Sequence, residues 1–303
     1  MSLIAGGDEV SILSRNPGKI MDLPENVNVL QWDGKTIQNW ANEISRTDAI
    51  INLTGENLSG NGFPPSRWTA ARKQRILQSR LDSGKVLTKA VEISSSKPSV
   101  FVQASGVNYY GTKQPDALSE EAPRGDDFLA NLSGEWEASS KPVEQMGLRR
   151  VIIRNGVVLS AMGGALPLLV LPYKLWVGGR IGSGKQIYSW IHILDEVRAI
   201  KFLIQTTTAA GPYNLTSPNP KTNDEFGREV GQVMHRPHYF PIPGFALHLA
   251  LGEVASMVLV GKRVLPKKLL DLGFQFRFSN LDAALEDIMQ PTAISKEESS
   301  SSF

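Results

Sequence analysis

Short apolar runs alternate with longer amphipathic stretches through the first half of the chain. Runs rich in β-branched and other apolar residues predict buried parallel strands at 9–14, 49–53, 100–104 and 151–153. The stretch 67–93 carries apolar residues at helical spacing among basic ones, which predicts one long crossover helix, or two. Another helix is predicted over 127–145, closing at Gly147, because glycine suits a helix C-terminus. The alternation predicts an α/β fold, a doubly wound parallel sheet with right-handed crossovers.

The pattern changes after Gly156. Residues 163–186 form an apolar stretch interrupted by Gly and Pro, and the strand-like run IYSWIHI follows at 187–193. We expect this part of the chain to lie outside the parallel core. Within it, His192 stands between two Ile residues and is predicted to be a hydrogen-bonded structural residue, while Asp195 is predicted to cap or begin the next helix.

The residue pattern toward the C-terminus predicts a second domain. Its pattern is helical over 237–289, with breaks at Pro and Gly. An aromatic cluster is expected at Phe274, Phe276 and Phe278. We therefore predict a first domain at 1–235 and a small C-terminal domain at 236–290. Residues 291–303 bury too little apolar surface to offset their ordering entropy and are predicted to be a disordered tail.

Composition narrows the class of protein. The chain has 303 residues, of which 41% are apolar and 20% charged, so neither disorder nor a coiled coil is expected. A formal charge of +2 is too small for a general phosphate-backbone binder, and we predict no nucleic-acid partner. The absence of Cys excludes disulfides, thiolate zinc sites and a Cys nucleophile. No run of about eighteen apolar residues occurs. We expect no membrane partner and a cytoplasmic protein, with mitochondria as the alternative.

The loop after the first predicted strand carries Ser14 and Arg15. In a doubly wound sheet, ligands bind at the carboxyl ends of the strands. An acidic residue in this loop would bind a ribose 2′-hydroxyl, whereas an arginine accommodates a 2′-phosphate. Arg15 therefore favours NADP over NAD as the cofactor. The alternative interpretation is an arginine solvated in a surface turn.

Several motifs together carry a family resemblance. They are NLTGEN at 52–57, SGVNYYG at 105–111, RNGVVL at 154–159, GSG at 182–184, WIHI at 190–193, NDEF at 223–226 and GF at 273–274. Through their order and spacing the sequence resembles the atypical extended short-chain dehydrogenase/reductases (SDR superfamily). Within these it is similar to the epimerase family proteins of the 39U-type subfamily, which have a DUF1731-like C-terminal domain. The resemblance covers nearly the whole chain.

The resemblance implies a Rossmann-type, NADP(H)-binding fold with a small C-terminal substrate domain. It also implies where the cofactor-binding residues lie: Ser14 and Arg15 at the adenosine phosphate, Leu53 and Thr54 beside the adenine and ribose, Arg75 and Arg80 on the neighbouring helix, and Val158 near the nicotinamide. At Arg75 the family pattern has an acidic residue, so a side chain facing solvent is the alternative there.

The start of the chain departs from the family pattern. Family members begin with a strand and a G-x-x-G-x-x-G turn that brings the pyrophosphate to a helix N-terminus. Neither is present, and residues 1–7 match only the end of the helix that should follow. Loss of a central strand would remove roughly ten ladder hydrogen bonds of about 1 kcal/mol each, compared with a typical stability of about 5–15 kcal/mol. We therefore expect weak NADPH binding or marginal folding.

The catalytic residues depart from the family pattern as well. Relatives carry a Tyr-x-x-x-Lys pair on the helix after the third loop, where this chain reads FLANLS at 128–133. A literal Tyr-x-x-x-Lys occurs at Tyr109 and Lys113, but Gly111 interrupts it and we interpret it as a coincidence. Ser105 matches the substrate-orienting serine of the family. Tyr109, or its neighbour Tyr110, is the candidate phenol. The alternatives are a turn role for the serine and packing for the tyrosines.

These residues support a hypothesis about function. The chain is expected to be an NADP-dependent oxidoreductase, or a nucleotide-sugar-epimerase-like protein, for an unidentified small molecule. The alternatives are a catalytically inactive NADP(H)-binding or sensor protein and a truncated isoform with impaired cofactor binding. No metal site is predicted, since Pro237 separates His235 from His238. Four tryptophans are expected to pack in the core or between domains: Trp32, Trp40, Trp68 and Trp136.

Overall fold

The computed structural model describes most of the chain. The described residues are 2–289 without 21–22, 25, 61, 63 and 113–116. Two sequence predictions lie outside the described residues: the disordered tail at 291–303, and the Lys113 half of the literal Tyr-x-x-x-Lys motif.

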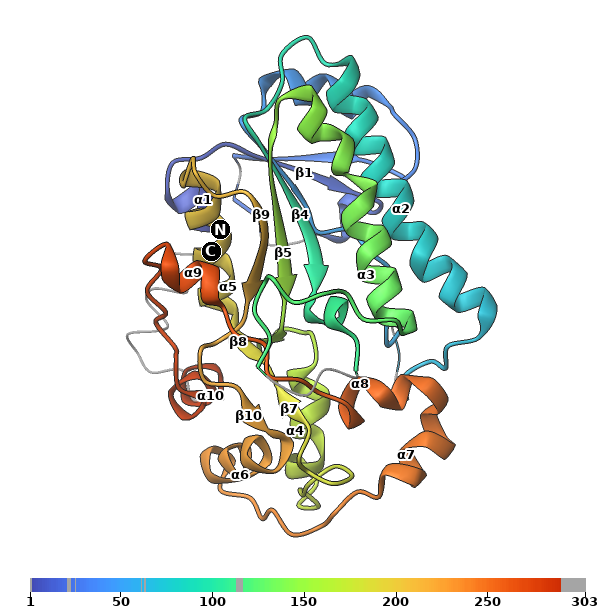
Figure 1. The fold of residues 1–303 in the computed structure, drawn as a ribbon, viewed down its shortest axis with the longest axis vertical. Helices are drawn as coiled ribbons and strands as arrows, with labels where there is room; N and C mark the ends of the chain where they lie inside the picture. The colour runs from blue at the N-terminus through green and yellow to red at the C-terminus, as the bar shows by residue number, and fades with distance from the viewer. Residues whose placement is uncertain are drawn as a thin grey trace.

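A four-stranded parallel sheet forms the centre of the molecule, in the order β3-β4-β5-β9 (Figure 1). Its strands are β3 (Ala49–Asn52), β4 (Val100–Gly106), β5 (Arg149–Asn155) and β9 (Gly211–Leu215). Because helices cover both faces, β4 and β5 are buried along almost their whole length. The predicted α/β class and the strands at 49–53, 100–104 and 151–153 are confirmed.

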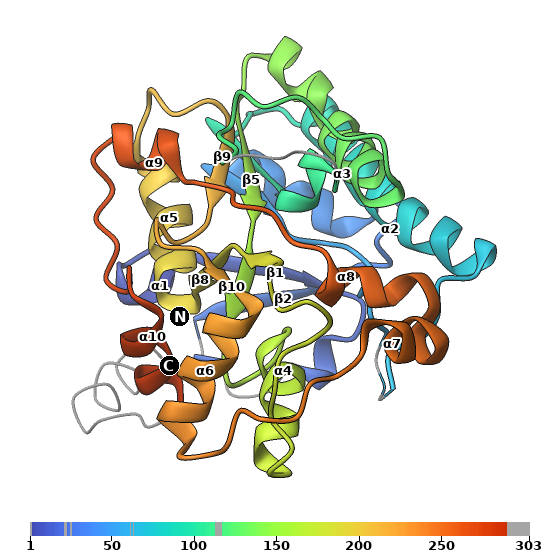
Figure 2. The ribbon, with the colours of Figure 1, turned by 60° about the horizontal axis from the view of Figure 1, so that its bottom comes forward.

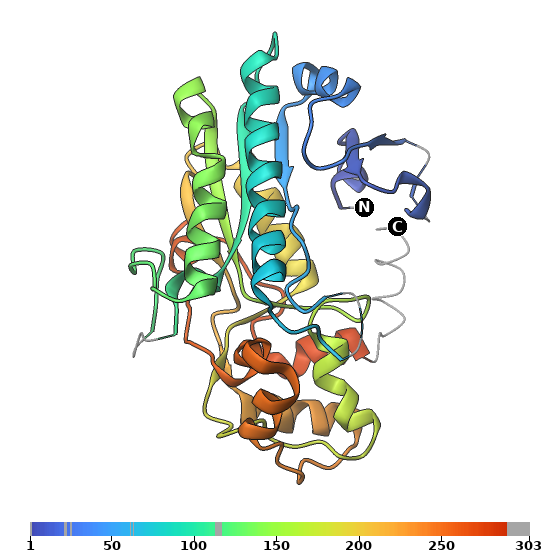
Figure 3. The ribbon, with the colours of Figure 1, turned by 90° about the vertical axis from the view of Figure 1, so that its right-hand side faces the viewer.

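Two long helices lie side by side on one face of this sheet (Figure 3). They are α2 (Ala70–Ile93) and α3 (Phe128–Ser139), so the crossover predicted at 67–93 is one helix. Asp127 caps α3 by accepting a hydrogen bond from the backbone N of Ala130 at 2.9 Å. A 3₁₀ turn (Lys141–Met146) continues the chain to Gly147, whose φ of 88° requires the left-handed conformation that glycine allows.

The first predicted strand is not part of the central sheet. β1 (Val10–Ser14) pairs in parallel with β2 (Val27–Gln31) in a separate two-stranded sheet. Among the described strands, β1 pairs only with β2 and β3 only with β4, so each has one edge without a neighbouring strand. The prediction of a buried strand at 9–14 was therefore wrong: β1 is half-buried, because a strand with one neighbour and a partly open face buries less surface.

The second half of the chain lies largely beyond the carboxyl ends of β4 and β5, where α4, α7 and α8 are seen (Figures 1 and 2). Two short strand pairs form there: β6 (Val157–Leu159) with β8 (Trp190–His192), and β7 (Ile187–Tyr188) with β10 (Lys221–Thr222). The remaining helices are α1 (Ser2–Ala5), α4 (Leu166–Lys174), α5 (Ile193–Gln205), α6 (Asn223–Met234), α7 (Gly244–Leu251), α8 (Ser256–Leu259), α9 (Lys267–Asp271) and α10 (Leu281–Met289). In the described part of the chain, every helix is too short or too polar to cross a membrane.

The C-terminal segment packs into the core of the first half. Phe274 joins the hydrophobic core of the central sheet and contacts Phe276 with ring centroids 4.9 Å apart. Phe278 belongs to a different core cluster and stacks on His192 at 4.0 Å. The expected aromatic cluster is therefore divided between two hydrophobic cores. Through them the C-terminal segment packs against two separate parts of the fold.

The residue that caps α5 is not the one expected from the sequence. The cap is His192, whose Nδ1 accepts a hydrogen bond from the backbone N of Leu194 at 3.1 Å. Asp195 lies within the first turn, and its carboxylate accepts hydrogen bonds from the backbone N of Arg277 (2.9 Å) and Phe278 (2.8 Å). The structural role predicted for His192 is confirmed. Asp195 neither caps nor begins the helix, which starts at Ile193; from its first turn it attaches the C-terminal segment to α5.

A buried carboxyl on α5 makes the stability of the fold dependent on pH. Glu196 is buried, and its Oε2 has no hydrogen-bond partner among the described residues. Burial raises the pKa of Glu196 to about 8, from 4.5. The native state therefore keeps a proton that the unfolded state releases, so the stabilisation present below pH 4.5 is lost progressively as the pH rises to about 8.

We predict that Glu196→Gln stabilises the protein most at alkaline pH, because the amide removes the cost of burying a carboxylate. Urea unfolding at pH 5 and pH 8.5 measures this: the gain in unfolding free energy over wild type should be larger at pH 8.5. Glu135→Gln, at an exposed position, is the matched control. An equal gain at both pH values would contradict the prediction.

Candidate functional site

A cavity of about 860 Å³ lies at the carboxyl ends of three successive strands of the central sheet. Its lining includes the loop after β3 at 57–59, residues 105–108 at the end of β4, and residues 155–158 between β5 and β6. The C-terminal segment contributes residues from α7 and α8 and on to Lys262. This volume is within the range of about 300–1,000 Å³ that small-molecule sites occupy, and the position is the usual one in open α/β sheets.

The walls of the cavity are largely apolar. They include Trp68, Phe128, Leu132, Trp136, Val158 and Leu168. Of the four tryptophans, Trp32 and Trp40 pack against each other in the core with centroids 5.5 Å apart, as predicted. Trp68 packs in a core cluster with Val254 of the C-terminal segment, and Trp136 packs against the core of the central sheet, as predicted. Both also line the cavity, a role that the sequence did not indicate because a tryptophan beside a ligand has the same helical spacing as one in a core.

Ser105 lies at the end of β4, buried and in the cavity wall. Its hydroxyl donates a hydrogen bond to Glu137 Oε1 at 2.7 Å. Glu137, on α3, forms a bidentate ion pair with Arg154 of β5: Nε to Oε1 at 2.9 Å and Nη2 to Oε2 at 3.0 Å. Since the carboxylate takes the hydroxyl hydrogen, the Oγ lone pairs of Ser105 are left to accept a hydrogen bond from a ligand.

Glu137 and Arg154 were not among the predicted site residues. The signal in the sequence was the charged Arg154 directly after the apolar run of β5, because a charge in a buried strand needs a partner. That partner is far away in the sequence, on a helix whose residues gave no indication of this contact. Packing of α3 on β4 and β5 brings the two together.

The candidate phenols are held by the same arginine. The Tyr109 ring lies 3.5 Å from the Arg154 guanidinium, and this tyrosine is not part of the cavity lining. Tyr110 is fully buried, donates a hydrogen bond to Asn214 Oδ1 at 2.6 Å and accepts one from Arg154 Nη1 at 3.0 Å. Burial raises the pKa of Tyr110 to about 12. The structure therefore does not bring Tyr109 together with Ser105 inside the cavity.

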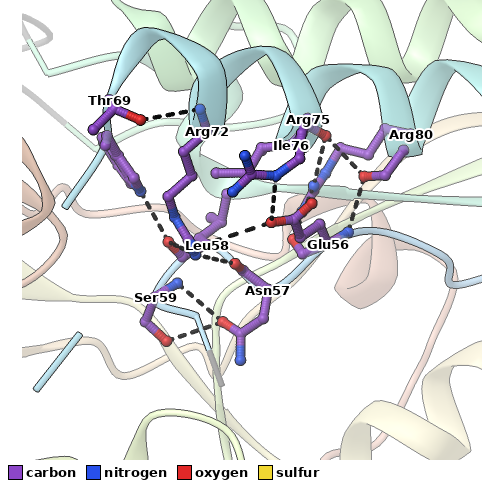
Figure 4. A network of polar contacts seen from close by, with 11 residues as sticks. Glu56, Asn57, Leu58, Ser59, Thr69, Arg72, Arg75, Ile76 and Arg80 are labelled. Atoms are coloured by element: carbon purple, nitrogen blue, oxygen red, sulfur yellow. Dashed lines mark hydrogen bonds and ion pairs between the residues drawn. The ribbon is translucent and has the colours of Figure 1, made fainter. Parts of the chain in front are cut away.

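Arg75 and Arg80, two of the predicted cofactor arginines, lie on α2 beside the loop after β3, together with Arg72 (Figure 4). Arg80 donates through Nη1 to the carbonyls of Glu56 (3.0 Å) and Ile76 (3.1 Å). Burial lowers the pKa of Arg80 to about 10. Arg75 is exposed and its Nε lies 3.9 Å from Glu56 Oε1. Arg72 donates to the Asn57 carbonyl at 2.9 Å. These arginines hold the loop on α2, and Arg80 lies in the cavity wall as well.

The other predicted cofactor residues are divided between the cavity and the surface. Val158, on β6, lines the cavity. Ser14 accepts a hydrogen bond from the backbone N of Asn16 at 3.1 Å, and Arg15 is exposed. Leu53 is 58% exposed, and the Thr54 hydroxyl donates to Asn52 Oδ1. Ser14, Arg15, Leu53, Thr54 and Arg75 lie outside the cavity lining, whereas Ser105, Arg80 and Val158 share it.

The cavity has groups that suit the nicotinamide half of a cofactor. Asn155 Oδ1 is buried, lies at the end of β5 and has no hydrogen-bond partner among the described residues, so it can accept from a carboxamide or a ribose hydroxyl. Val158 and Trp136 offer apolar surface for the ring. For the pyrophosphate, the described lining offers no turn of the G-x-x-G-x-x-G type; the glycine that it places before an α-helix is Gly164, which precedes α4. The residues of the cavity therefore fit the nicotinamide end of the cofactor.

Comparison with known sequences gives two family matches and several relatives. Residues 2–216 match the NAD dependent epimerase/dehydratase family, and residues 242–288 match a domain of unknown function, DUF1731. The chain is 38% identical over 286 residues to the epimerase family protein YfhF of Bacillus subtilis, covering 93% of this chain and 90% of the relative. It is 40% identical over 263 residues to the epimerase family protein MW0731 of Staphylococcus aureus, covering 86% and 82%.

Solved structures show the same fold. The human epimerase family protein SDR39U1 (isoform 2) with NADPH has a TM-score of 0.81 and 31% identity, covering 96% of this chain and 94% of that one. The UDP-glucose 4-epimerase of Thermus thermophilus in complex with NAD has a TM-score of 0.73 at 15% identity, covering 96% and 94%. At that identity, the second similarity supports the Rossmann-type fold alone.

We predict that Glu137→Gln destabilises the protein, because it leaves Arg154 charged and buried without its ion pair. Breaking such a pair costs about 3–5 kcal/mol of unfolding free energy. The matched control is Glu92→Gln, which breaks the exposed pair with Lys89, where about 0–1 kcal/mol is expected. Denaturant unfolding of both variants checks this, and equal losses would count against the buried pair.

Proposed function

The chain belongs to the NAD-dependent epimerase/dehydratase family of the SDR superfamily and carries a DUF1731 domain, and we propose that it is an NADP(H)-dependent oxidoreductase, or epimerase-like enzyme, for a small molecule. The observation that carries the proposal is the cavity at the carboxyl ends of β3, β4 and β5, with buried Ser105 in its wall.

Two observations favour NADP(H) over NAD(H). The human relative that is 31% identical over nearly the whole chain was solved with NADPH. Arg15 at the carboxyl end of β1 is exposed, and a guanidinium there can pair with a 2′-phosphate. An NAD-bound neighbour of low identity bears only on the fold.

In this proposal the residues of the chain orient the substrate and exclude water. A bound nicotinamide ring supplies or accepts the hydride. Ser105 Oγ accepts a hydrogen bond from a hydroxyl of the substrate, and the Glu137–Arg154 pair keeps the serine in one orientation. The apolar walls around Trp136 and Leu132 limit the access of water to the reacting carbon.

A catalytically inactive NADP(H)-binding protein is the second candidate. It is favoured by Tyr109, which packs on Arg154 outside the cavity lining, and by Tyr110, whose raised pKa makes it a weak proton donor. Incubation with NADPH and a panel of carbonyl compounds separates the two: steady loss of NADPH absorbance supports the enzyme, and saturable binding without oxidation supports the binding protein.

We predict that the protein binds NADPH more tightly than NADH and that Arg15→Glu removes this preference. The expected loss is about tenfold or more for NADPH, with little change for NADH, because only NADPH carries the 2′-phosphate. Titration by nucleotide fluorescence measures both constants. Arg46→Glu, an equal change of charge at another exposed position, is the control. Equal weakening of both nucleotides would remove Arg15 from the phosphate site.

We also predict that Ser105→Ala lowers the NADP⁺-dependent oxidation of any alcohol that the protein accepts by about 10²-fold, with NADPH affinity unchanged. The matched control is Ser133→Ala: this hydroxyl also lines the cavity but donates to the Leu129 carbonyl at 2.9 Å. Unchanged turnover in Ser105→Ala would exclude this serine from the mechanism.

A further inference from the structure

The C-terminal segment brings a lysine, Lys262, into the cavity wall. Its backbone is held in place: the Ser189 hydroxyl donates to the Lys262 carbonyl at 2.7 Å and accepts from the backbone N of Val264 at 2.9 Å. The preceding Gly261 packs so closely on the chain that an added Cβ would lie 2.1 Å from the Ile187 carbonyl oxygen. The position of Lys262 is therefore set by main-chain contacts. Its side chain takes no part in them and can contact a ligand in the cavity.

Lys262 is a partly buried cation without a close counter-charge. Among the described residues, none forms a salt bridge or hydrogen bond with its ammonium group, and the field of Asp127 is the one favourable charge that acts on it. Burial lowers the pKa of Lys262 to about 8, so at neutral pH the side chain is mainly protonated. A charge in an apolar wall is costly unless a partner comes to it.

The other charged groups of the lining are held by contacts within the protein or face solvent, although Asp127 Oδ2 and Arg80 Nε are buried without a hydrogen-bond partner among the described residues. Arg80 donates to two backbone carbonyls, and Glu253 forms an ion pair with Lys73. Asp127 caps α3, where the backbone N–H groups and the helix dipole stabilise its carboxylate. His248 is exposed on α7. Of the lysines and arginines in the described lining, Lys262 is therefore the one whose charged group makes no hydrogen bond or ion pair.

We propose that Lys262 is the anion-binding residue of this cavity and that the substrate is a small molecule with an apolar body and a carboxylate group. The inference deepens the proposed function, on which it rests for placing the substrate here. The apolar body is matched by Phe128, Leu132 and Trp136 in the walls. A carboxylate matches one ammonium, whereas a phosphate dianion would need a second cation, and the guanidinium of Arg80 already donates to the carbonyls of Glu56 and Ile76.

The test compares two ligands of the same shape, 2-naphthoate and 2-naphthamide, by isothermal titration calorimetry at pH 7. We expect the wild-type protein to bind the carboxylate at least tenfold more tightly than the amide. Lys262→Met should bind both equally, and Lys262→Arg should keep the preference, because it keeps the charge. Equal binding of both ligands by wild type, an unchanged preference in Lys262→Met, or no saturation at millimolar naphthoate would each overturn the proposal.

The pH dependence is a second measurement of the same contact. Wild-type affinity for naphthoate should fall by up to tenfold per pH unit above about 8, as Lys262 loses its proton. Lys262→Arg should show no such fall up to pH 10, since arginine stays protonated. A fall of the same size in Lys262→Arg would assign the titration to another group and would overturn the proposal.

An NADPH titration of the same variants separates this proposal from the function on which it rests. Lys262→Met should bind NADPH as wild type does and should keep a cooperative thermal transition. If NADPH binds normally but naphthoate does not bind, the substrate class is wrong and the cofactor proposal stands. A loss of NADPH affinity of tenfold or more in both Lys262→Met and Lys262→Gln would make Lys262 a cofactor contact and overturn its role with substrate.

Discussion

The buried ion pair between Arg154 and Glu137 is the contact on which the geometry of the site depends. Two charges taken out of water are tolerable only when they are well paired, so β5 and α3 are held in the one arrangement that keeps them together. Ser105 of β4 adds a hydrogen bond to Glu137, and Tyr109 packs on Arg154. This cluster therefore aligns the carboxyl ends of two central strands with the helix that forms a wall of the cavity.

The same end of the sheet is tied to the C-terminal segment by a second carboxylate. Glu120 accepts hydrogen bonds from the backbone N of Asn214 (3.0 Å) and of Lys268 (3.3 Å), which links β9 to α9. Together with the contacts of Asp195, these bonds keep the segment that bears Lys262 close to the strand ends. The cavity is thus assembled from parts of both predicted domains. Ser105 comes from the first of them and Lys262 from the second.

How far the fold and the site could be predicted depended on the range of the interactions. The strands β3, β4 and β5, the helix at 70–93 and the turn at Gly147 follow from local patterns and were predicted, whereas β9 was not. The strand β1 was predicted but its partial exposure was not, because burial depends on which strands lie beside it. In the site, Ser105, Arg80 and Val158 share the cavity, while Tyr109 is held by Arg154 outside its lining.

The sequence by itself determined the class of fold, the family and the kinds of polar group that the strand-end loops carry. Periodicity and turn residues record local burial and backbone conformation, and both act over a few residues. Only the tertiary structure decided that Glu137 meets Arg154 and that Lys262 shares a cavity with Ser105. These contacts join segments far apart in the chain, and their existence depends on how whole helices and strands pack, which no local pattern records.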